Sequence, residues 1–208
     1  MIALLGGTFD PVHRGHIEAA LAAQQLLRVA EVRLVVASQP YHKASRVSAA
    51  EHRLAMVREA CGHHEGLIAD GSELGHDQPS YTVDLLARRR ASAPRERRTW
   101  VIGMDAFADV QSWSRWEQVF ALTNFLVFER QGFESRLPAA LKRWLRDRLT
   151  ERIDGRRHGQ VQIVRHIELP QVSSTQIRRA VRRGGRCEHL LPEGVFSYIR
   201  AHQLYAGR

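Results

Sequence analysis

Short apolar runs recur along this chain, and segments with helical periodicity separate them. The runs lie at residues 2–5, 32–37, 67–69, 100–103 and 125–128, and residues 161–167 alternate between apolar and polar. Runs rich in Val, Ile and Leu are typical of strands that are covered on both faces in a parallel sheet. In the intervening segments apolar residues recur every three or four positions, which predicts helices near residues 17–27, 54–61, 83–90 and 137–149.

This order of elements predicts an α/β fold. A strand, a helix and a second parallel strand form a right-handed crossover, and repeating that unit gives a Rossmann-like open parallel sheet with helices on both faces. Ser48 and Glu51 fit a capping box, which predicts where the second helix begins. The sequence has no internal repeat, low-complexity tract or linker. We therefore expect residues 1–208 to form a single domain, with the Rossmann-like core over 1–170 and a short C-terminal helical region over 171–208.

Composition and charge narrow the class of protein. With 44% hydrophobic and 25% charged residues, the chain has the balance of a globular protein. No run approaches the roughly 18 apolar residues of a membrane span, and residues 2–5 are too few for a signal peptide, so we expect a cytoplasmic protein without a membrane partner. Cys61 and Cys187 are widely spaced and indicate reduced thiols rather than a zinc site or a disulfide.

The formal net charge of +9 fits a polyanionic partner. Nucleic acid, small phosphorylated substrates and a merely arginine-rich surface are all compatible with it. No recognised nucleic-acid motif and no aromatic interleaving accompany the basic clusters. Charge alone therefore does not predict nucleic acid as a partner.

The densest chemical pattern is GGTFDPVHRGH at residues 6–16, where the first strand passes into the first helix. Gly6 and Gly7 lack a Cβ, so the backbone can adopt positive φ and a phosphate can approach its amides. The Asp-Pro pair that follows indicates a turn or the start of the helix. His13 and His16 are three residues apart, and on a helix both imidazoles would project to one side near its positive end. Each feature alone is commonly structural; together and in this order they favour a phosphate site.

Residues 172–178, VSSTQIR, form a second cluster. Ser173 and Gln176 fit a capping box, so a helix should begin there. Its free amides and the hydroxyls of Ser174 and Thr175 could receive an anion, with Arg178 one turn further along the same face. An ordinary capped helix would explain the serines alone, but not their pairing with the first motif.

Loops after the other strands carry further candidates, because open parallel sheets bind ligands at the carboxyl edge. Lys43 could meet a phosphate or be merely solvated. The amides at Tyr81 and Thr82 could receive a carboxylate, although a plain helix cap explains the same residues. Asp105 could hold ribose hydroxyls or cap a helix.

Trp113 and Trp116 lie three residues apart in a polar segment. Such a pair is commonly core packing. An indole with one free face is also a good platform for a flat heteroaromatic ring. The spacing leaves both interpretations open.

The two clusters resemble the HxGH and SSTxIR motifs of the nucleotidyltransferase superfamily. Over nearly the whole chain the sequence is similar to the bacterial nicotinate-mononucleotide adenylyltransferases, the enzymes that make deamido-NAD from ATP. The segments that carry this resemblance are PYHK (40–43), RLAM (53–56), PSYT (79–82), GMDAF (103–107), the tryptophan pair and the tail at 192–205. Departures are Ile17 where leucine is common and Val172 where isoleucine is common, and the arginine-rich residues 151–160 have no assigned role.

The resemblance implies a role for each matching position. The catalytic residues would be His13, His16 and Arg178. The residues around ATP would be Gly6, Gly7, Thr8, Phe9, Gly103, Asp105, Ser174 and Thr175. The mononucleotide would contact Lys43, Tyr81, Thr82 and Trp116, the last beneath the nicotinate ring.

The resemblance also implies a reaction. The phosphate of nicotinate mononucleotide would attack the α-phosphorus of ATP in line and release pyrophosphate, with no protein nucleophile and with protonated histidines as hydrogen-bond donors. We expect Mg²⁺ as the cofactor, held mainly by substrate phosphates and water rather than by protein ligands. Alternatives are another acceptor, nicotinamide mononucleotide or phosphopantetheine, and a basic nucleic-acid-binding protein. The sequence leaves the oligomeric state open.

Overall fold

The computed structural model of the chain describes residues 1–38, 47–75, 80–130 and 137–206. In these ranges the strands form one parallel sheet with the order β3-β2-β1-β4-β5-β6. The strands are β1 (Ile2–Gly7), β2 (Val32–Val36), β3 (Leu67–Asp70), β4 (Arg98–Gly103), β5 (Asn124–Arg130) and β6 (Val161–Ile167). Lys43 lies outside the described residues, so its predicted role keeps the status of a prediction.

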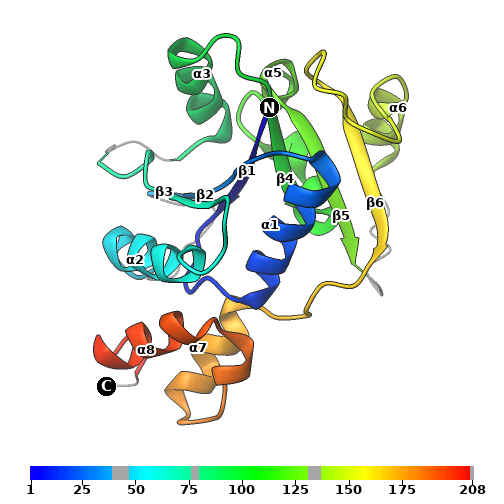
Figure 1. Cartoon of the computed structure of the whole chain (residues 1–208). Helices are drawn as coiled ribbons and strands as arrows, with labels where there is room; N and C mark the ends of the chain where they lie inside the picture. The colour runs from blue at the N-terminus through cyan, green and yellow to red at the C-terminus, as the bar shows by residue number, and fades with distance from the viewer. Residues whose placement is uncertain (39–46, 76–79, 131–136, 207–208) are drawn as a thin grey trace.

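Helices connect the strands and extend beyond the last one (Figure 1). The α-helices are α1 (Arg14–Leu27), α2 (Ala50–Cys61), α3 (Thr82–Ser92), α4 (Met104–Ala108), α5 (Trp116–Leu122), α6 (Ala139–Leu145), α7 (Ser174–Arg182) and α8 (Glu193–Ala201). Two short 3₁₀ helices are η1 (Val110–Ser112) and η2 (Glu188–Leu190). No described helix has the length and apolar composition that crossing a bilayer requires.

The sheet has a hydrophobic core on each face. Ala3 and Leu5 of β1 pack in one cluster with apolar residues of α1, α2, α7 and α8. Ile2 and Leu4 of the same strand pack in a second cluster with residues of α3, α4, α5 and α6. Successive side chains of a strand point to opposite faces, so β1 contributes to both cores. The prediction of a parallel α/β sheet with helices on both faces is confirmed.

The strand order reverses between β1 and β4. The chain proceeds outward from β1 to β2 and β3, and then returns to the other side of β1 for β4, β5 and β6. Loops diverge at such a point and leave a crevice beyond the carboxyl ends of the two central strands. In Figure 1 helices α7 and α8 lie beyond this same edge, with α8 packed against α2. The division at residue 170 into core and C-terminal region is a prediction.

Two local predictions are wrong. The helix expected over residues 137–149 ends at Leu145, because the chain turns and brings Leu149 into a parallel bridge with Val161. The Ser48 capping box does not form, since the N-cap of α2 is Ala49 and no side chain caps it. The backbone of Ser48 instead contacts Asp10 and Arg53. Asp10 belongs to the turn at residues 8–13 between β1 and α1, which is called the phosphate turn below.

Candidate active site

A cleft of about 330 Å³ opens at the carboxyl edge of the sheet, between the ends of β1 and β4. Its walls come from segments that the sequence analysis had singled out separately. The lining includes Gly6, Gly7, Thr8, Gly15, His16, Tyr81, Thr82, Gly103 and Asp105. Residues that had not been assigned to a site also line it: Glu73, Ser80, Ala106 and Ser114, together with Trp113. The fold therefore joins the first phosphate motif to the loops after β3 and β4.

The glycines of the first motif are required for close packing rather than for positive φ. A Cβ on Gly6 would lie 2.3 Å from the ring of Trp100, and one on Gly7 would lie 2.8 Å from the ring of Phe9. Neither glycine has positive φ, whereas Phe9 does, with φ at 50°. Such a conformation is uncommon for a bulky residue. The Phe9 ring packs against Gly7, is 2% exposed and does not line the cleft.

The two histidines lie at the very start of α1. His13 is the N-cap and His16 follows in the first turn, with the two rings stacked at a centroid distance of 3.7 Å. The main-chain N–H of His13 donates to Nδ1 of His16 over 3.2 Å. Because Nδ1 accepts this bond, the ring hydrogen of His16 is on Nε2. In this arrangement Nε2 is the ring nitrogen of His16 that remains to donate, and protonation of the ring beside bound phosphates stays a prediction.

Only one of the two rings reaches the cleft. His16 is half-buried and lines it, whereas His13 is 3% exposed and lies behind. Gly15 between them permits the packing, since a Cβ there would lie 3.0 Å from the carbonyl oxygen of Pro170 and 3.2 Å from the His13 ring. Pro170, in the segment before α7, therefore packs closely against Gly15, between the two histidines. The residues around His13 and His16 are called the histidine turn below.

The second phosphate motif meets the first. Ser173 caps α7 by accepting from the amide of Gln176 over 3.2 Å, as the sequence predicts. The Ser174 hydroxyl donates to the carbonyl oxygen of Pro11 over 2.9 Å, across 163 positions of sequence. Nη1 of Arg178 donates to the carbonyl oxygen of Asp10 over 2.6 Å. The predicted convergence of the two motifs is therefore present in the structure.

Among the described residues, side chains of α7 do not line this cleft. Nη2 of Arg178 donates to the Thr175 hydroxyl over 3.2 Å, so both terminal nitrogens of the guanidinium contact the protein. Thr175 is exposed. The hydrogen bond from Arg178 to the carbonyl oxygen of Asp10 connects α7 to the turn and places a positive charge beside it.

Asp10 and Pro11 form a turn, which is one of the two alternatives that the sequence left open, and α1 begins four residues after Asp10, at Arg14. The carboxylate of Asp10 is 2% exposed. Oδ1 accepts from the hydroxyl of Tyr205 over 2.7 Å, and Oδ2 from the amide of Ser48 over 3.5 Å. The C-terminal end of the chain therefore contacts the phosphate turn.

Arg53 fixes the same region from beneath. It is 1% exposed, and its guanidinium donates only to main-chain oxygens among its hydrogen bonds in the described part of the chain. The acceptors are the carbonyl oxygens of Thr8 (2.9 Å), Ala37 (2.6 Å), Ser38 (2.8 Å) and Ser48 (2.9 Å). Burial lowers the pKa of this guanidinium, which arginine tolerates without losing its charge.

The adenosine-side candidates adjoin one another. Gly103 is the N-cap of α4 and Asp105 stands in its first turn. A Cβ on Gly103 would lie 2.5 Å from Oδ1 of Asp105, so the carboxylate lies over the glycine and no other residue fits there without a shift. Asp105 makes no side-chain cap to the helix, and it is exposed where it lines the cleft.

The start of α3 forms the opposite wall. Tyr81 is its N-cap and makes no side-chain cap, and Thr82 is the first helical residue. The amides of a first helical turn have no acceptor within the helix. The adjacent Ser80 accepts from the amide of Ser38 over 2.9 Å, which ties this wall to the end of β2.

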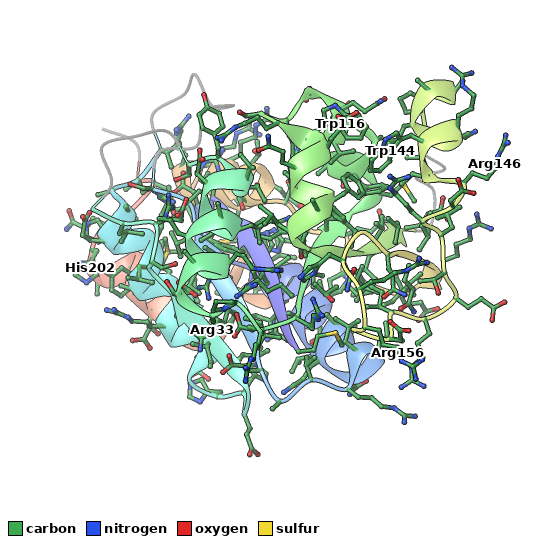
Figure 2. All side chains as sticks on the ribbon, turned by 90° about the horizontal axis from the view of Figure 1, so that it is seen from above. Arg33, Trp116, Trp144, Arg146, Arg156 and His202 are labelled. Atoms are coloured by element: carbon green, nitrogen blue, oxygen red, sulfur yellow. The ribbon has the colours of Figure 1, made fainter. Side chains whose placement is uncertain are left out.

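The two tryptophans of the pair have different surroundings. Trp113 lines the cleft. Trp116 begins α5 and packs edge-on against Trp144, at a centroid distance of 4.7 Å, and against Phe120 at 6.0 Å (Figure 2). Trp116 does not line the cleft among the described residues, and its role under the nicotinate ring is a prediction.

With this geometry in hand, the chain can be compared with known proteins. The sequence model of a family described as cytidylyltransferase-like matches residues 4–180. This chain belongs to the cytidylyltransferase-like family. The matched range includes β1 from Leu4 onward, strands β2 to β6 and both phosphate motifs.

Individual relatives of this family member narrow the comparison. A protein of Pseudomonas syringae pv. tomato named "Probable nicotinate-nucleotide adenylyltransferase" is 38% identical over 207 residues, which is 98% of this chain and 93% of that protein. A protein of the same name from Acidithiobacillus ferrooxidans is 36% identical over 207 residues, or 98% and 95% of the two chains. The resemblance to bacterial nicotinate-mononucleotide adenylyltransferases, and the assignment of the chain as a nucleotidyltransferase, are confirmed.

Solved structures support the fold of this nucleotidyltransferase. The nicotinic acid mononucleotide adenylyltransferase of Plasmodium falciparum, complexed with NaAD, superposes with a TM-score of 0.79 at 18% identity, over 98% of this chain and 96% of that one. At such identity the similarity establishes the Rossmann-like architecture alone.

Sequence reasoning missed several residues of the nucleotidyltransferase site. Trp113 had been paired with Trp116 but not placed at the ligand. Arg53 and Tyr205 had been noted only within family segments, because a buried arginine that contacts carbonyl oxygens leaves no charge pattern in sequence. The sequence does carry one signal for Arg53: it is the single basic residue in the otherwise apolar run RLAMV at positions 53–57.

Among the described residues, no group of three or more His, Cys, Asp or Glu side chains is arranged to hold a metal ion. In the part of the chain that the structure describes, the carboxylates lining the cleft are Asp105 and Glu73. Glu73 is paired with Arg88, which leaves Asp105 as the more available oxygen ligand in this wall.

Proposed function

We propose that this chain transfers the adenylyl group of ATP to nicotinate mononucleotide, giving deamido-NAD and pyrophosphate. One observation carries the proposal: a single cleft adjoins the histidine turn, the Gly103–Asp105 wall and the start of α3. An adenylyl transfer needs a site for each nucleotide on either side of a phosphate site. The names of the relatives support nicotinate mononucleotide as the acceptor.

ATP would bind across the end of β1. Asp105 would accept from the ribose hydroxyls, while the amides near Gly7 and Thr8 and the Nε2–H of His16 would donate to phosphate oxygens. Ser174, Thr175 and Arg178 would add donors and positive charge from α7. Gly103 supports the adenosine region by leaving space for the Asp105 carboxylate.

The mononucleotide would bind against the start of α3. Its ring carboxylate would accept from the first-turn amides near Tyr81 and Thr82, where the positive end of the helix dipole favours an anion. The amide form carries no such charge, which supports a preference for the acid. Trp116 would offer its ring to the pyridine, and Lys43 would meet the phosphate.

The reaction would be a direct displacement. A phosphate oxygen of the mononucleotide forms a bond to the α-phosphorus of ATP, the bond to the bridging oxygen breaks, and pyrophosphate leaves. Positioning and charge neutralisation accelerate such transfers. His16 donates from Nε2 to an oxygen that gains negative charge, and His13 stacks behind it and holds its orientation.

Mg²⁺ would neutralise charge on the phosphates when bound. It would be held mainly by phosphate oxygens and water. Asp105 is the cleft carboxylate that could add a protein oxygen, since Glu73 is paired with Arg88. The described residues therefore fit a metal that arrives with the nucleotide.

Release of pyrophosphate tests the proposal. Wild-type protein is incubated with ATP, Mg²⁺ and, in parallel, nicotinate mononucleotide, nicotinamide mononucleotide or phosphopantetheine. We expect the highest kcat/KM with nicotinate mononucleotide. A higher value with another acceptor would reassign the substrate, and salt-sensitive binding of nucleic acid without turnover of any acceptor would overturn the enzyme assignment.

A further inference from the structure

The C-terminal end of the described chain reaches into the phosphate turn through one side chain. After α8 ends at Ala201, Gln203 and Tyr205 both adopt positive φ, at 51° and 63°. The left-handed region is unfavourable for such residues unless their surroundings impose it. These two conformations turn the chain back over α2, where the Tyr205 hydroxyl lies 4.0 Å from Sδ of Met56 and 2.7 Å from Oδ1 of Asp10.

The partner of Tyr205 is a carboxylate that faces Arg178. Asp10 is 2% exposed, and its Oδ2 forms a long ion pair with Nη1 of Arg178, at 3.9 Å. That nitrogen already donates to the main-chain oxygen of Asp10 over 2.6 Å. The amide of Ser48 is a long contact to Oδ2, at 3.5 Å, so the hydroxyl of Tyr205 makes the shortest hydrogen bond to this carboxylate among the described residues.

We propose that Tyr205 is a positioning residue that keeps the ion pair between Asp10 and Arg178 at its long distance, and so leaves the remaining donors of the guanidinium available for the triphosphate of ATP. A buried carboxylate needs donors. If the hydroxyl is removed, Asp10 can shorten its existing ion pair with Arg178. Burial and the neighbouring Asp10 carboxylate raise the pKa of Tyr205, so the hydroxyl remains a donor at neutral pH. The inference rests on the proposed function, because it assumes that ATP binds beside α7.

A matched control exists in the same part of the chain. Tyr198 in α8 is also half-buried, and its hydroxyl makes a hydrogen bond of 2.9 Å to Nδ1 of His52, on the outer side of α2. Tyr198→Phe and Tyr205→Phe each remove one hydroxyl oxygen and its short hydrogen bond, and Tyr205→Phe also removes the 4.0 Å contact to Met56. Only Tyr205 is bonded to the phosphate turn.

The experiment measures kcat/KM for ATP and for nicotinate mononucleotide in wild type, Tyr205→Phe and Tyr198→Phe, below the lowest of the three melting midpoints. We expect Tyr205→Phe to lower kcat/KM for ATP by about 10-fold, the loss typical of a hydrogen bond to a charged group, and to change the value for the mononucleotide by less than about twofold. Tyr198→Phe should match wild type for both substrates. Equal losses in the two variants, or equal losses for the two substrates, would overturn the inference.

A second background tests the mechanism. In Asp10→Asn no carboxylate remains to compete for Arg178, so adding Tyr205→Phe should change kcat/KM for ATP by less than about twofold. A further 10-fold loss in that background would contradict the proposal. If wild type turns over none of the acceptors, the proposed function fails, and calorimetric titration of ATP with Mg²⁺ into the same variants still tests the inference: weaker binding in Tyr205→Phe alone supports it, and equal binding in all variants overturns it.

Discussion

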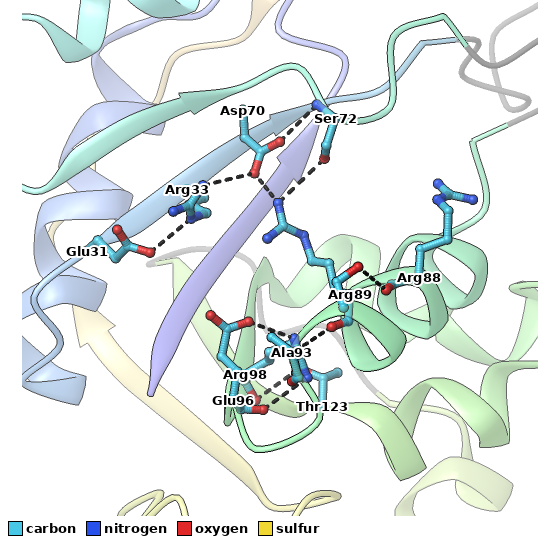
Figure 3. Close-up of polar contacts among 11 residues, drawn as sticks. Glu31, Arg33, Asp70, Ser72, Arg88, Arg89, Ala93, Glu96, Arg98 and Thr123 are labelled. Carbon is cyan, nitrogen blue, oxygen red and sulfur yellow. Dashed lines mark hydrogen bonds and ion pairs between the residues drawn. The ribbon is translucent and has the colours of Figure 1, made fainter.

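Two buried arginines lie at opposite edges of the sheet, and their guanidinium groups donate to carbonyl oxygens at different distances along the sequence. Arg53 lies under the cleft at the carboxyl edge, and Arg98 begins β4 at the amino edge; they are 1% and 0% exposed. Arg98 donates to the carbonyl oxygens of Arg89 (2.7 Å), Ala93 (2.7 Å) and Glu96 (2.9 Å), and also pairs with the Glu96 carboxylate (Figure 3). Burial lowers the pKa of both guanidinium groups.

The difference lies in the sequence distance that each arginine spans. The acceptors of Arg98 are at most nine positions away, so it closes the C-terminal end of α3 locally. The acceptors of Arg53 reach 45 positions back, to Thr8, and join the phosphate turn to the ends of β2 and to the start of α2. We infer that the amino edge supplies stability alone, whereas the carboxyl edge supplies stability and the geometry of the site.

The largest expected effect concerns a histidine at each edge. His16→Ala should lower kcat by about 10²-fold or more, as removal of one preorganised donor does, because His16 is the ring that lines the cleft. His158, near Arg98, should have no such role, so His158→Ala should keep kcat within about twofold of wild type. Steady-state release of pyrophosphate measures both. A near-normal kcat in His16→Ala would remove the catalytic role.

The second prediction compares the two arginines directly. Arg53→Met and Arg98→Met each leave buried carbonyl oxygens without donors, so each should lower the free energy of unfolding by about 3 kcal/mol or more. Only Arg53→Met should also lower kcat of the folded protein, by about 10-fold, because it releases the turn at Thr8. Urea unfolding and kinetics at low temperature separate the two effects.

Lysine variants serve as controls for charge. Arg53→Lys keeps the charge but cannot reach four carbonyl oxygens at once, so it should restore little of the lost kcat. If Arg53→Met and Arg98→Met have the same kcat once folded, the distinction between the edges is wrong.

The same contrast explains what sequence could predict. The strands, the parallel sheet and the meeting of the two phosphate motifs follow from local apolar patterns and from short motifs. The capping box at Ser173 forms because its partners are three residues apart. The one at Ser48 does not, because the backbone of Ser48 is engaged by Asp10 and Arg53. Arg53 and Tyr205 act on residues far away in sequence, and no local pattern encodes such partners.

Glycines illustrate the same limit. Sequence placed Gly6 and Gly7 where the first strand ends, and they are the last two residues of β1, but it attributed them to positive φ. The actual reason is the proximity of Trp100 and Phe9, which depends on how β4 pairs with β1. Glycine is required here by tertiary contacts, which the residue type alone does not predict.

A smaller effect is expected at the carboxyl edge from substitution of the two tryptophans. If Trp116 receives the nicotinate ring, Trp116→Ala should raise KM for the mononucleotide by about 10-fold, the loss of one stacking contact, and leave KM for ATP nearly unchanged. Trp113→Ala is the matched comparison, since Trp113 lines the cleft and Trp116 packs on Trp144. If only Trp113→Ala selectively raises KM for the mononucleotide, Trp113 rather than Trp116 contacts the nicotinate ring. Equal changes in both KM values would indicate core packing.

The smallest expected effect is a pH dependence of stability at the amino edge. Burial and the charges of Arg97, Arg90 and Arg98 lower the pKa of His158 from 6.5 to about 4. Below pH 6.5 the unfolded chain therefore binds a proton that the folded protein does not, so stability falls from pH 6.5 to about pH 4. The melting midpoint of wild type should drop further over this range than that of His158→Gln, which carries no titratable group at this position. Identical drops would show that His158 does not titrate differently in the folded protein, and the amino edge would then lack the close-packed arginine environment that distinguishes it from the cleft.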